Sequence, residues 1–174
     1  MAVIKEEKII CEEKEEIEKF SSAGFGRIVD NKLILHPLEA CYLFELGLIK
    51  INLPKNQSTK KQNIFELLLS YSKEKRAILK PIERYAIYKE IRSVGRVVRF
   101  NIHDPNYWFV YARGVGREEE RAQILLNIIN PKIKIDVKQL ETKLALSRQF
   151  RMEIVLAFTK NSKPQFIKLS KYSF

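Results

Sequence analysis

The stretch Tyr107–Gly114 holds the residue best suited to chemistry in this chain, the phenol of Tyr111. Large and β-branched residues surround Tyr111 and predict a strand. Alternation along a strand would place Tyr111 and Phe109 on the same face of a sheet. A phenol at a strand end, beside a glycine turn, can take part in proton transfer only if a base and a cation meet it. The chemistry open to this chain therefore depends on whether such partners converge on Tyr111.

The two histidines of the chain have ordinary structural roles available to them. His36 precedes Pro37, at the start of a predicted helix, where capping is the expected role. His103 lies in a predicted turn eight residues before Tyr111, which places it at the opposite end of the same strand, about 25 Å away by strand rise. We therefore expect neither histidine to partner Tyr111.

The charge of the chain points to a polyanionic partner. The net charge is +11, and residues 1–20 carry seven Glu and four Lys, so the other 154 residues carry +14. A basic body of this kind most often binds nucleic acid. A thermophile-like surface rich in Lys and Glu explains the composition equally well. Aspartate is scarce, and a two-metal nuclease needs clustered carboxylates, so we expect no metal site and no cofactor.

The remaining composition is that of an ordinary cytoplasmic protein of one or two domains. At 174 residues the chain is long enough for a substantial core. The sequence contains no apolar run of about 20 residues and no signal peptide, which predicts no membrane association. Cys11 and Cys41 have no metal-ligand spacing, and we expect two buried, reduced thiols rather than a disulfide.

The first part of the chain predicts a small α+β domain. Residues 1–20 fit either a strand pair or a charged helix, and a loop is expected over 21–26. The other expected elements are strands at 27–29, 32–35 and 48–51 and helices at 37–46 and 64–72, with a loop at 54–63. Lysine- and arginine-rich residues 73–76 and Lys80-Pro81 mark the expected boundary. The predicted domains are therefore residues 1–80 and 81–174.

The second part predicts an α/β layer with a mixed sheet. Its expected order is helix 82–94, strands 96–102, 107–112 and 123–129, helix 137–152, and strands 153–159 and 166–169, with a turn at 160–164. Basic and aromatic residues flank the apolar stripe of the first helix; these are Arg84, Tyr85, Tyr88 and Arg92. They could hold RNA, but packing of the helix on the sheet is the more common reason for such a pattern.

This order of elements, together with several local motifs, resembles the archaeal tRNA-splicing endonuclease family from Gly24 onward. The matching segments are Gly26–Leu33, Leu38–Leu43 with Gly47, Tyr88–Gly95, Phe109–Tyr111 and Arg151–Ala157. The resemblance implies a small N-terminal α+β domain followed by a restriction-endonuclease-like α/β domain with a mixed sheet. It also implies metal-independent RNA cleavage by a Tyr as base, a His as acid and a Lys as cation.

Two of the three catalytic positions carry other residue types in this chain. Tyr111 matches the family's Tyr, Arg121 stands where the His is expected, and Met152 stands where the Lys is expected. A guanidinium does not donate a proton usefully at pH 7, and a thioether has neither proton nor charge. The resemblance therefore implies no catalytic residue in this chain and no metal.

The resemblance also bears on RNA binding. The family's base-stacking Arg corresponds to Ala145, and Arg148 lies one turn later. The candidate RNA-binding residues are Arg113, Arg148, Arg151 and Lys160. The segment 160–164 is basic where the family has an acidic assembly loop. It could therefore contact RNA or accept an acidic loop of a partner.

The last predicted strand is the candidate interface, formed by Phe166, Ile167, Lys168 and Leu169. An exposed apolar edge invites strand pairing. The favoured interpretation is a non-catalytic subunit of a heterotetramer, two of each chain, that acts with a catalytic subunit on precursor tRNA at bulge-helix-bulge sites. One alternative is a stand-alone RNA-binding protein with a degenerate nuclease fold. Another is a nuclease rebuilt around Tyr111, Arg113 and Arg121.

Overall fold

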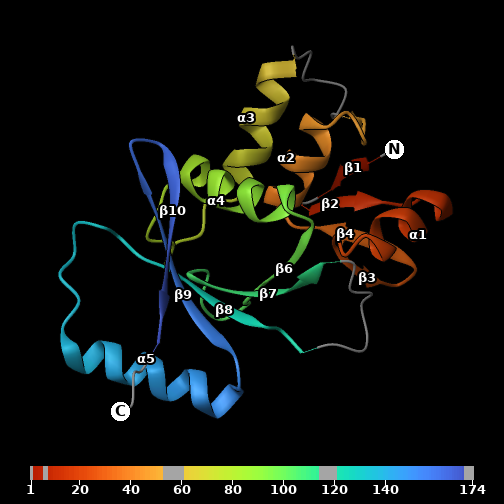
Figure 1. Cartoon of the computed structure of the whole chain (residues 1–174). Helices are drawn as coiled ribbons and strands as arrows, with labels where there is room; N and C mark the ends of the chain where they lie inside the picture. The colour runs from red at the N-terminus through yellow and green to blue at the C-terminus, as the bar shows by residue number, and fades with distance from the viewer. Residues whose placement is uncertain (1, 6–7, 53–60, 114–120, 171–174) are drawn as a thin grey trace. The chain divides into compact units, whose positions relative to one another are not determined.

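A computed structural model describes residues 2–5, 8–52, 61–113 and 121–170, apart from the side chains of residues 5, 61–63 and 113. The chain divides into two compact units, residues 1–73 and residues 74–115 with 119–174 (Figure 1). The sequence boundary expected at residue 80 stays a prediction.

The elements of the first unit are β1 (Ala2–Lys5), β2 (Lys8–Cys11), α1 (Lys14–Ser22), β3 (Arg27–Val29), β4 (Lys32–Leu35), α2 (Pro37–Glu45), β5 (Ile51–Asn52) and α3 (Lys61–Tyr71). Those of the second unit are α4 (Pro81–Ser93), β6 (Arg96–Phe100), β7 (Tyr107–Arg113), β8 (Ile124–Ile128), α5 (Val137–Phe150), β9 (Glu153–Lys160) and β10 (Lys163–Leu169).

The first unit is built on a five-stranded sheet in the order β3-β4-β2-β1-β5. β1 and β5 pair in parallel, and the other neighbours pair in antiparallel fashion. Asp30 and Asn31 join β3 to β4 with φ angles of 49° and 59°. Asp and Asn tolerate this left-handed conformation, which tight hairpins require. The hairpin predicted around these two residues is confirmed.

His36 caps helix α2, as its position before Pro37 predicted. The Leu38 N–H donates to His36 Nδ1 at 3.2 Å. The buried Glu39 carboxylate accepts from the His36 N–H at 2.8 Å and from the Gly26 N–H at 3.0 Å. These contacts satisfy backbone donors that a helix start leaves without partners. The imidazole of His36 is therefore engaged in folding the first unit.

The first unit departs from the sequence expectations in its first 20 residues and at several helix ends, including the start of α3 at Lys61, within the loop expected over 54–63. Residues 1–20 form both a strand pair and the start of α1, where a choice between the two was expected. The loop expected over 21–26 is wrong at its start, because α1 continues to Ser22 and the left-handed residue that ends it is Gly24. The strand expected at 48–51 is also wrong in extent. The Leu48 N–H bonds back to the Leu43 carbonyl at 2.9 Å, so this residue closes α2 and strand pairing starts only at Ile51.

The second unit holds the mixed sheet that the sequence predicted. Its order is β10-β9-β8-β7-β6, with β8 and β9 parallel and the other neighbours antiparallel. Helix α4 packs on one face, where Tyr88 stacks on Phe100 at 5.7 Å between ring centroids and meets the buried Trp108 edge-on. Helix α5 covers the opposite face, where Leu146 packs on a cluster formed by Leu125, Ile154 and Leu156 (Figure 1). The predicted order of helices and strands is confirmed.

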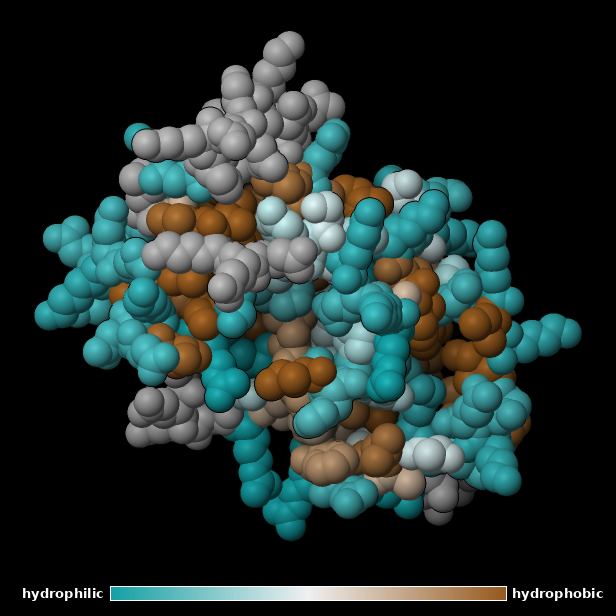
Figure 2. Space-filling view, turned by 180° about the vertical axis from the view of Figure 1, so that it is seen from behind, coloured by the Kyte–Doolittle hydropathy of each residue, from teal (hydrophilic) through white to brown (hydrophobic). Residues whose placement is uncertain are grey.

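The residues that flank the apolar stripe of α4 serve the core. Arg84, Tyr85 and Tyr88 are buried, and Arg92 donates to the Arg96 carbonyl at 2.9 Å. Packing of the helix on the sheet therefore explains these side chains, as the sequence favoured. On the face seen in Figure 2, apolar side chains reach the surface in several separate places among hydrophilic ones.

The turn between β9 and β10 is shorter than the sequence indicated. Lys160 pairs with Lys163, so only Asn161 and Ser162 lie in the turn, with φ angles of 50° and 61°. The expectation of a basic loop over 160–164 is therefore wrong, because the strand ladder extends to both lysines. β10 lies at the end of the strand order and is an edge strand within the described part of the sheet.

Cys11 and Cys41 are free and buried in the first unit, as predicted. Burial is the main reason that the pKa of each thiol rises to about 12, and a neighbouring carboxylate, Glu16 or Glu45, adds to the effect. Both thiols are therefore held in the neutral form at ordinary pH.

Candidate functional site

Tyr111 lies near the end of β7, on the face of the sheet that α5 covers. It stands opposite Val97 of β6 in the register of the sheet and is half-buried. Its neighbour on the same face, Phe109, packs on the α5-side cluster, whereas Trp108 and Val110 are buried on the α4 side. The alternation predicted from the sequence is therefore observed.

Tyr111, Arg121 and Met152 line one cavity of about 520 Å³, which we name the Tyr111 pocket. The other residues that line it are Phe109, Ala122, Gln149, Phe150 and Arg151. Arg121 is exposed on the segment that leads into β8, and Met152 sits between α5 and β9. The fold thus brings together three positions that are 41 residues apart from first to last.

The end of α5 positions Met152 at this pocket. Arg151 ends the helix in a left-handed conformation, with φ 52° and ψ 42°. The Met152 N–H donates to the Ser147 carbonyl at 3.1 Å, and the Ser147 hydroxyl donates to the Met152 carbonyl. These two contacts use backbone groups that the helix end would otherwise leave without partners. They fix the direction in which the chain enters β9.

The Tyr111 pocket combines a phenol with two guanidinium groups, those of Arg121 and Arg151. None of the described residues that line it is a histidine, a lysine or a carboxylate. Guanidinium groups hold phosphate well but do not exchange a proton near pH 7. His103 is exposed in the connection between β6 and β7, at the other end of β7 from Tyr111, with its backbone N–H on Asn101 Oδ1. The pocket is therefore suited to anion binding and lacks a described group for general acid catalysis.

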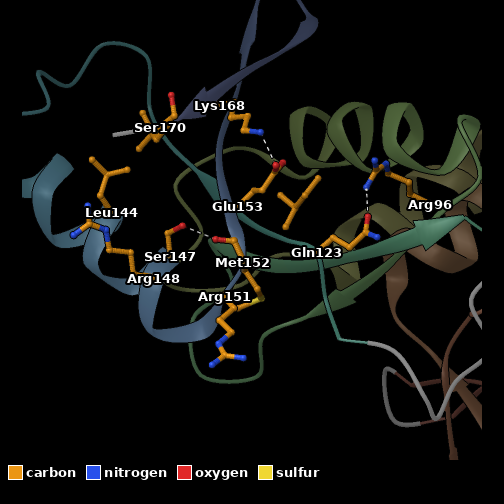
Figure 3. A pocket seen from close by; sticks show the side chains of 12 residues that line it. Arg96, Gln123, Leu144, Ser147, Arg148, Arg151, Met152, Glu153, Lys168 and Ser170 are labelled. Atoms are coloured by element: carbon orange, nitrogen blue, oxygen red, sulfur yellow. Dashed lines mark hydrogen bonds and ion pairs between the residues drawn. The ribbon is translucent and has the colours of Figure 1, made fainter. Parts of the chain in front are cut away.

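A second, larger cavity of about 800 Å³ adjoins the first, and we name it the Arg148 pocket. Arg151 and Met152 line both cavities. The other residues that line it are Arg96, Gln123, Ile124, Leu144, Ser147, Arg148, Glu153, Lys168, Leu169 and Ser170. Figure 3 shows Arg148 on α5 and Arg96 across the start of β9 from it. Arg96 donates a hydrogen bond to the side-chain oxygen of Gln123. The cavity therefore lies at the end of the sheet where β8 and β9 begin.

The predicted RNA-binding residues are separated in the structure. Arg148 and Arg151 both line the Arg148 pocket, and their side chains point in different directions in Figure 3. Lys160 is exposed at the opposite end of β9 and lines neither cavity. The side chain of Arg113 lies outside the described residues. Ala145 is exposed on α5 and contributes no cation.

Sequence reasoning missed Arg96, Gln123 and Lys168 as parts of a site. A signal for Arg96 was present, because the predicted turn at residues 103–106 folds its strand back on the Tyr111 strand. The observed register places Arg96 opposite Arg113, at the end of the sheet that carries Tyr111. Lys168 was assigned to the interface with Phe166 and Ile167. Its ammonium is ion-paired with Glu153 at the rim of the Arg148 pocket.

Two family models match this chain and together span most of its length. The model described as the tRNA intron endonuclease N-terminal domain matches residues 1–64. The model described as the tRNA intron endonuclease catalytic C-terminal domain matches residues 82–166, which include Tyr111, Arg121 and Met152.

The chain belongs to the tRNA intron endonuclease family.

Relatives of this tRNA intron endonuclease family member occur in archaea, several of them thermophiles. The chain is 25% identical to a tRNA-splicing endonuclease of Thermococcus gammatolerans over 138 residues, which cover 79% of this chain and 76% of the relative. It is 27% identical to that of Thermococcus onnurineus over 133 residues, covering 76% and 72%. It is 23% identical to that of Methanococcus vannielii over 156 residues, covering 90% and 84%. These matches place the chain among proteins of tRNA processing.

The described residues contain neither a helix suited to span a membrane nor a metal-binding cluster. Among the helices described, none has the length and apolar character needed to cross a bilayer. The described residues likewise contain no cluster of three or more His, Cys, Asp and Glu side chains arranged to hold a metal ion.

Proposed function

We propose that this chain is a non-catalytic, structural subunit of a cytoplasmic tRNA-splicing endonuclease. It assembles with a separate catalytic chain, two copies of each, and the complex excises introns from precursor tRNA at bulge-helix-bulge sites. The observation that carries the proposal is the composition of the Tyr111 pocket. A phenol remains there beside Arg121 and Met152, with no described imidazole or ammonium group lining the cavity.

The chemistry of RNA cleavage explains why this composition favours a structural role. Attack of a 2′-hydroxyl needs a group that removes its proton, a group that protonates the leaving oxygen, and a positive charge near the phosphate. Arg121 and Arg151 can supply charge but not the proton. A pocket that combines a phenol and guanidinium groups with no described acid supports binding rather than turnover.

The edge strand β10 supports assembly with a partner chain. Phe166 and Ile167 are 40% and 48% exposed, and they lie on opposite faces of the strand because side chains alternate. An exposed edge with apolar side chains on both faces can take an added strand, which would cover both. The two-residue turn before β10 leaves no long loop at 160–164 to insert into another subunit. We propose that the edge of β10, formed by Phe166–Leu169, pairs with the catalytic subunit.

The decisive experiment combines this protein with a homologue from the same genome that carries Tyr, His and Lys at the three positions. The isolated chain should leave a labelled precursor tRNA intact in the presence of EDTA, and cleavage should appear after the two chains are mixed. The Tyr111→Phe variant, mixed in the same way, should support cleavage within about twofold of wild type. Metal-free cleavage by the isolated chain that is lost in Tyr111→Phe would overturn the proposal and favour a rebuilt nuclease site.

A stand-alone RNA-binding protein is the second candidate, and the Arg148 pocket is the observation that favours it. Three guanidinium groups line that cavity. This alternative predicts a monomer that binds structured RNA and ignores the catalytic homologue. Size-exclusion chromatography coupled to light scattering, with and without the homologue, separates the two candidates.

A further inference from the structure

We propose that the Arg148 pocket is a second phosphate-binding site, which holds the RNA backbone next to the nucleotide that faces Tyr111. This inference rests on the proposal that the chain is part of a complex that cleaves RNA, and it names a surface of the chain that would contact the RNA. The proposed site assigns Arg148, Arg151 and Arg96 to one continuous contact with a single RNA strand.

The balance of charge in the cavity is the first argument. Four cationic side chains line it, those of Arg96, Arg148, Arg151 and Lys168, against one carboxylate, that of Glu153. The Lys168 ammonium is ion-paired with Glu153, which neutralises that carboxylate. Within the described part of the chain, neither Arg148 nor Arg151 is in an ion pair with a carboxylate. Three guanidinium groups therefore remain to meet an anion.

The arrangement of these arginines is the second argument. Arg148 extends from the last turn of α5, and Arg151 extends from the residue that follows the helix, in a different direction (Figure 3). Arg96 lies across the start of β9, with its Nη1 3.4 Å from Gln123 Oε1. The Ser147 contact with Met152 fixes the end of α5, and thereby the base from which Arg148 and Arg151 extend. Guanidinium groups on two sides of one cavity can bind phosphate oxygens in a forked, two-bond geometry.

The adjoining Tyr111 pocket is the reason for proposing an RNA strand, rather than a free anion, as the ligand. Arg151 and Met152 form the wall common to both cavities, so a chain of nucleotides can pass from one to the other without leaving the protein surface. Both cavities fall within the roughly 300–1,000 Å³ range of ligand sites. Each is therefore large enough for part of a nucleotide.

The residues that line the Arg148 pocket also indicate what it recognises. None of the described residues around it is aromatic, so the cavity offers no ring on which a base could stack. Backbone contacts from arginine position a nucleic acid without reading its sequence. We therefore expect binding that depends strongly on salt and little on sequence.

The test uses the full chain and a fluorescein-labelled, single-stranded 12-nucleotide RNA, with Kd measured by anisotropy from 50 to 300 mM KCl. The variant is Arg148→Gln, because Arg148 is exposed and its loss should not affect folding. The matched control is Lys134→Gln, which removes one exposed charge from the same unit away from both cavities.

Arg148→Gln should weaken binding at least about tenfold at 100 mM KCl, as expected for loss of one hydrogen bond between charged groups. It should also reduce the slope of log K against log salt by about 0.7, the value for one phosphate contact on a single strand. Lys134→Gln should change Kd less than about twofold. An equal effect of the two variants, or no measurable RNA binding by the wild-type chain, would overturn the inference.

A parallel measurement of association with the catalytic homologue separates this inference from the proposed function. If the complex forms normally but Arg148→Gln binds RNA like the control, the second phosphate site is wrong and the structural role stands. If no complex forms and the Arg148 effect is present, the structural role fails and the phosphate site stands. If Arg148→Gln weakens the complex and leaves RNA binding unchanged, the pocket holds an acidic protein segment and the inference is overturned.

Discussion

The guanidinium of Arg84 lies 3.0 Å from the Glu74 carboxylate, although the Arg84 side chain is only 1% exposed. The same guanidinium donates to the Pro105 carbonyl at 3.3 Å and lies 5.7 Å from the centre of the Trp108 ring. A buried cation is tolerated only where such partners replace its hydration. Arg84 therefore links α4 to the segment before it and to the start of β7.

Replacement of Arg84 by alanine should destabilise the protein by about 3 kcal/mol, because it removes the ion pair and leaves a cavity beside Trp108. Glu74→Gln should cost less, about 1–2 kcal/mol, since the Glu74 side chain is 34% exposed and partly screened. Urea unfolding monitored by Trp108 fluorescence measures both values. Arg76→Ala, at an exposed arginine of the same unit, should change stability by less than about 0.5 kcal/mol. Equal stability of Arg84→Ala and Arg76→Ala would contradict this account.

Lys143 should be important for the docking of α5 on the sheet. Its ammonium donates to the Tyr107 hydroxyl at 3.2 Å and to Oδ1 of the buried Asn127, and α5 itself has no fully buried residue. Lys143→Met should lower stability by about 1–2 kcal/mol, because the amide oxygen of the buried Asn127 loses its ammonium donor. Hydrogen exchange in α5 should accelerate. The control is Lys138→Met, an exposed position of the same helix; similar exchange in both variants would argue against the role of Lys143.

The buried thiols predict a loss of stability at alkaline pH. The pKa of Cys11 and of Cys41 rises from an ordinary value of 9.0 to about 12 in the folded chain. The unfolded chain therefore loses these protons first. The stabilisation is complete below about pH 9 and decreases as the pH rises toward 12, by about 1.4 kcal/mol per thiol at pH 10.

This loss is measured as the difference in unfolding free energy between pH 8 and pH 10. A Cys11→Ala, Cys41→Ala double variant is less stable at pH 8 because of the cavities it creates. Its unfolding free energy should nevertheless fall less than that of the wild-type protein between pH 8 and pH 10. Equal pH dependence of the two proteins would show that the thiols do not contribute. The native protein should also react slowly with Ellman's reagent at pH 8, because the reactive species is the thiolate.

The proposed subunit contact makes Ile167 a sensitive position. Ile167→Lys should weaken association with the catalytic homologue at least tenfold, because a charge would be buried against the added strand. The isolated variant should keep its fold, since Ile167 is 48% exposed. Gln139→Lys adds the same charge at an exposed position of α5 and should leave association unchanged. Analytical ultracentrifugation of the mixed chains measures both; unimpaired assembly of Ile167→Lys would place the interface elsewhere.

Local signals predicted much of the fold. The turn at Asp30-Asn31 and the cap at His36 depend on short-range chemistry, and both were found where the residue types indicated. The boundaries that were misjudged lie in the turn between β9 and β10 and at helix ends. There the choice between Ser22 and Gly24 as an end point, or the use of the Leu48 N–H, depends on backbone contacts that a sequence pattern does not display.

The candidate site was only partly accessible from the sequence. Tyr111, Arg121 and Met152 were grouped through family resemblance, and all three line one cavity. The Arg148 pocket was not foreseen as a whole, because it depends on the register of β6 with β7 and of β10 with β9. A shift of one residue in either pair would turn Arg96 or Lys168 to the other face of the sheet.

The two-residue turn at Asn161-Ser162 has a consequence for how a partner chain would be recognised. Because Lys160 pairs with Lys163, the turn has no extra residues that would let β10 change its pairing register with β9. The backbone N–H and C=O groups on the free edge of β10 are therefore held at fixed spacings before a partner strand binds. A partner strand that pairs with this edge would lose conformational entropy on binding, whereas β10 would lose almost none.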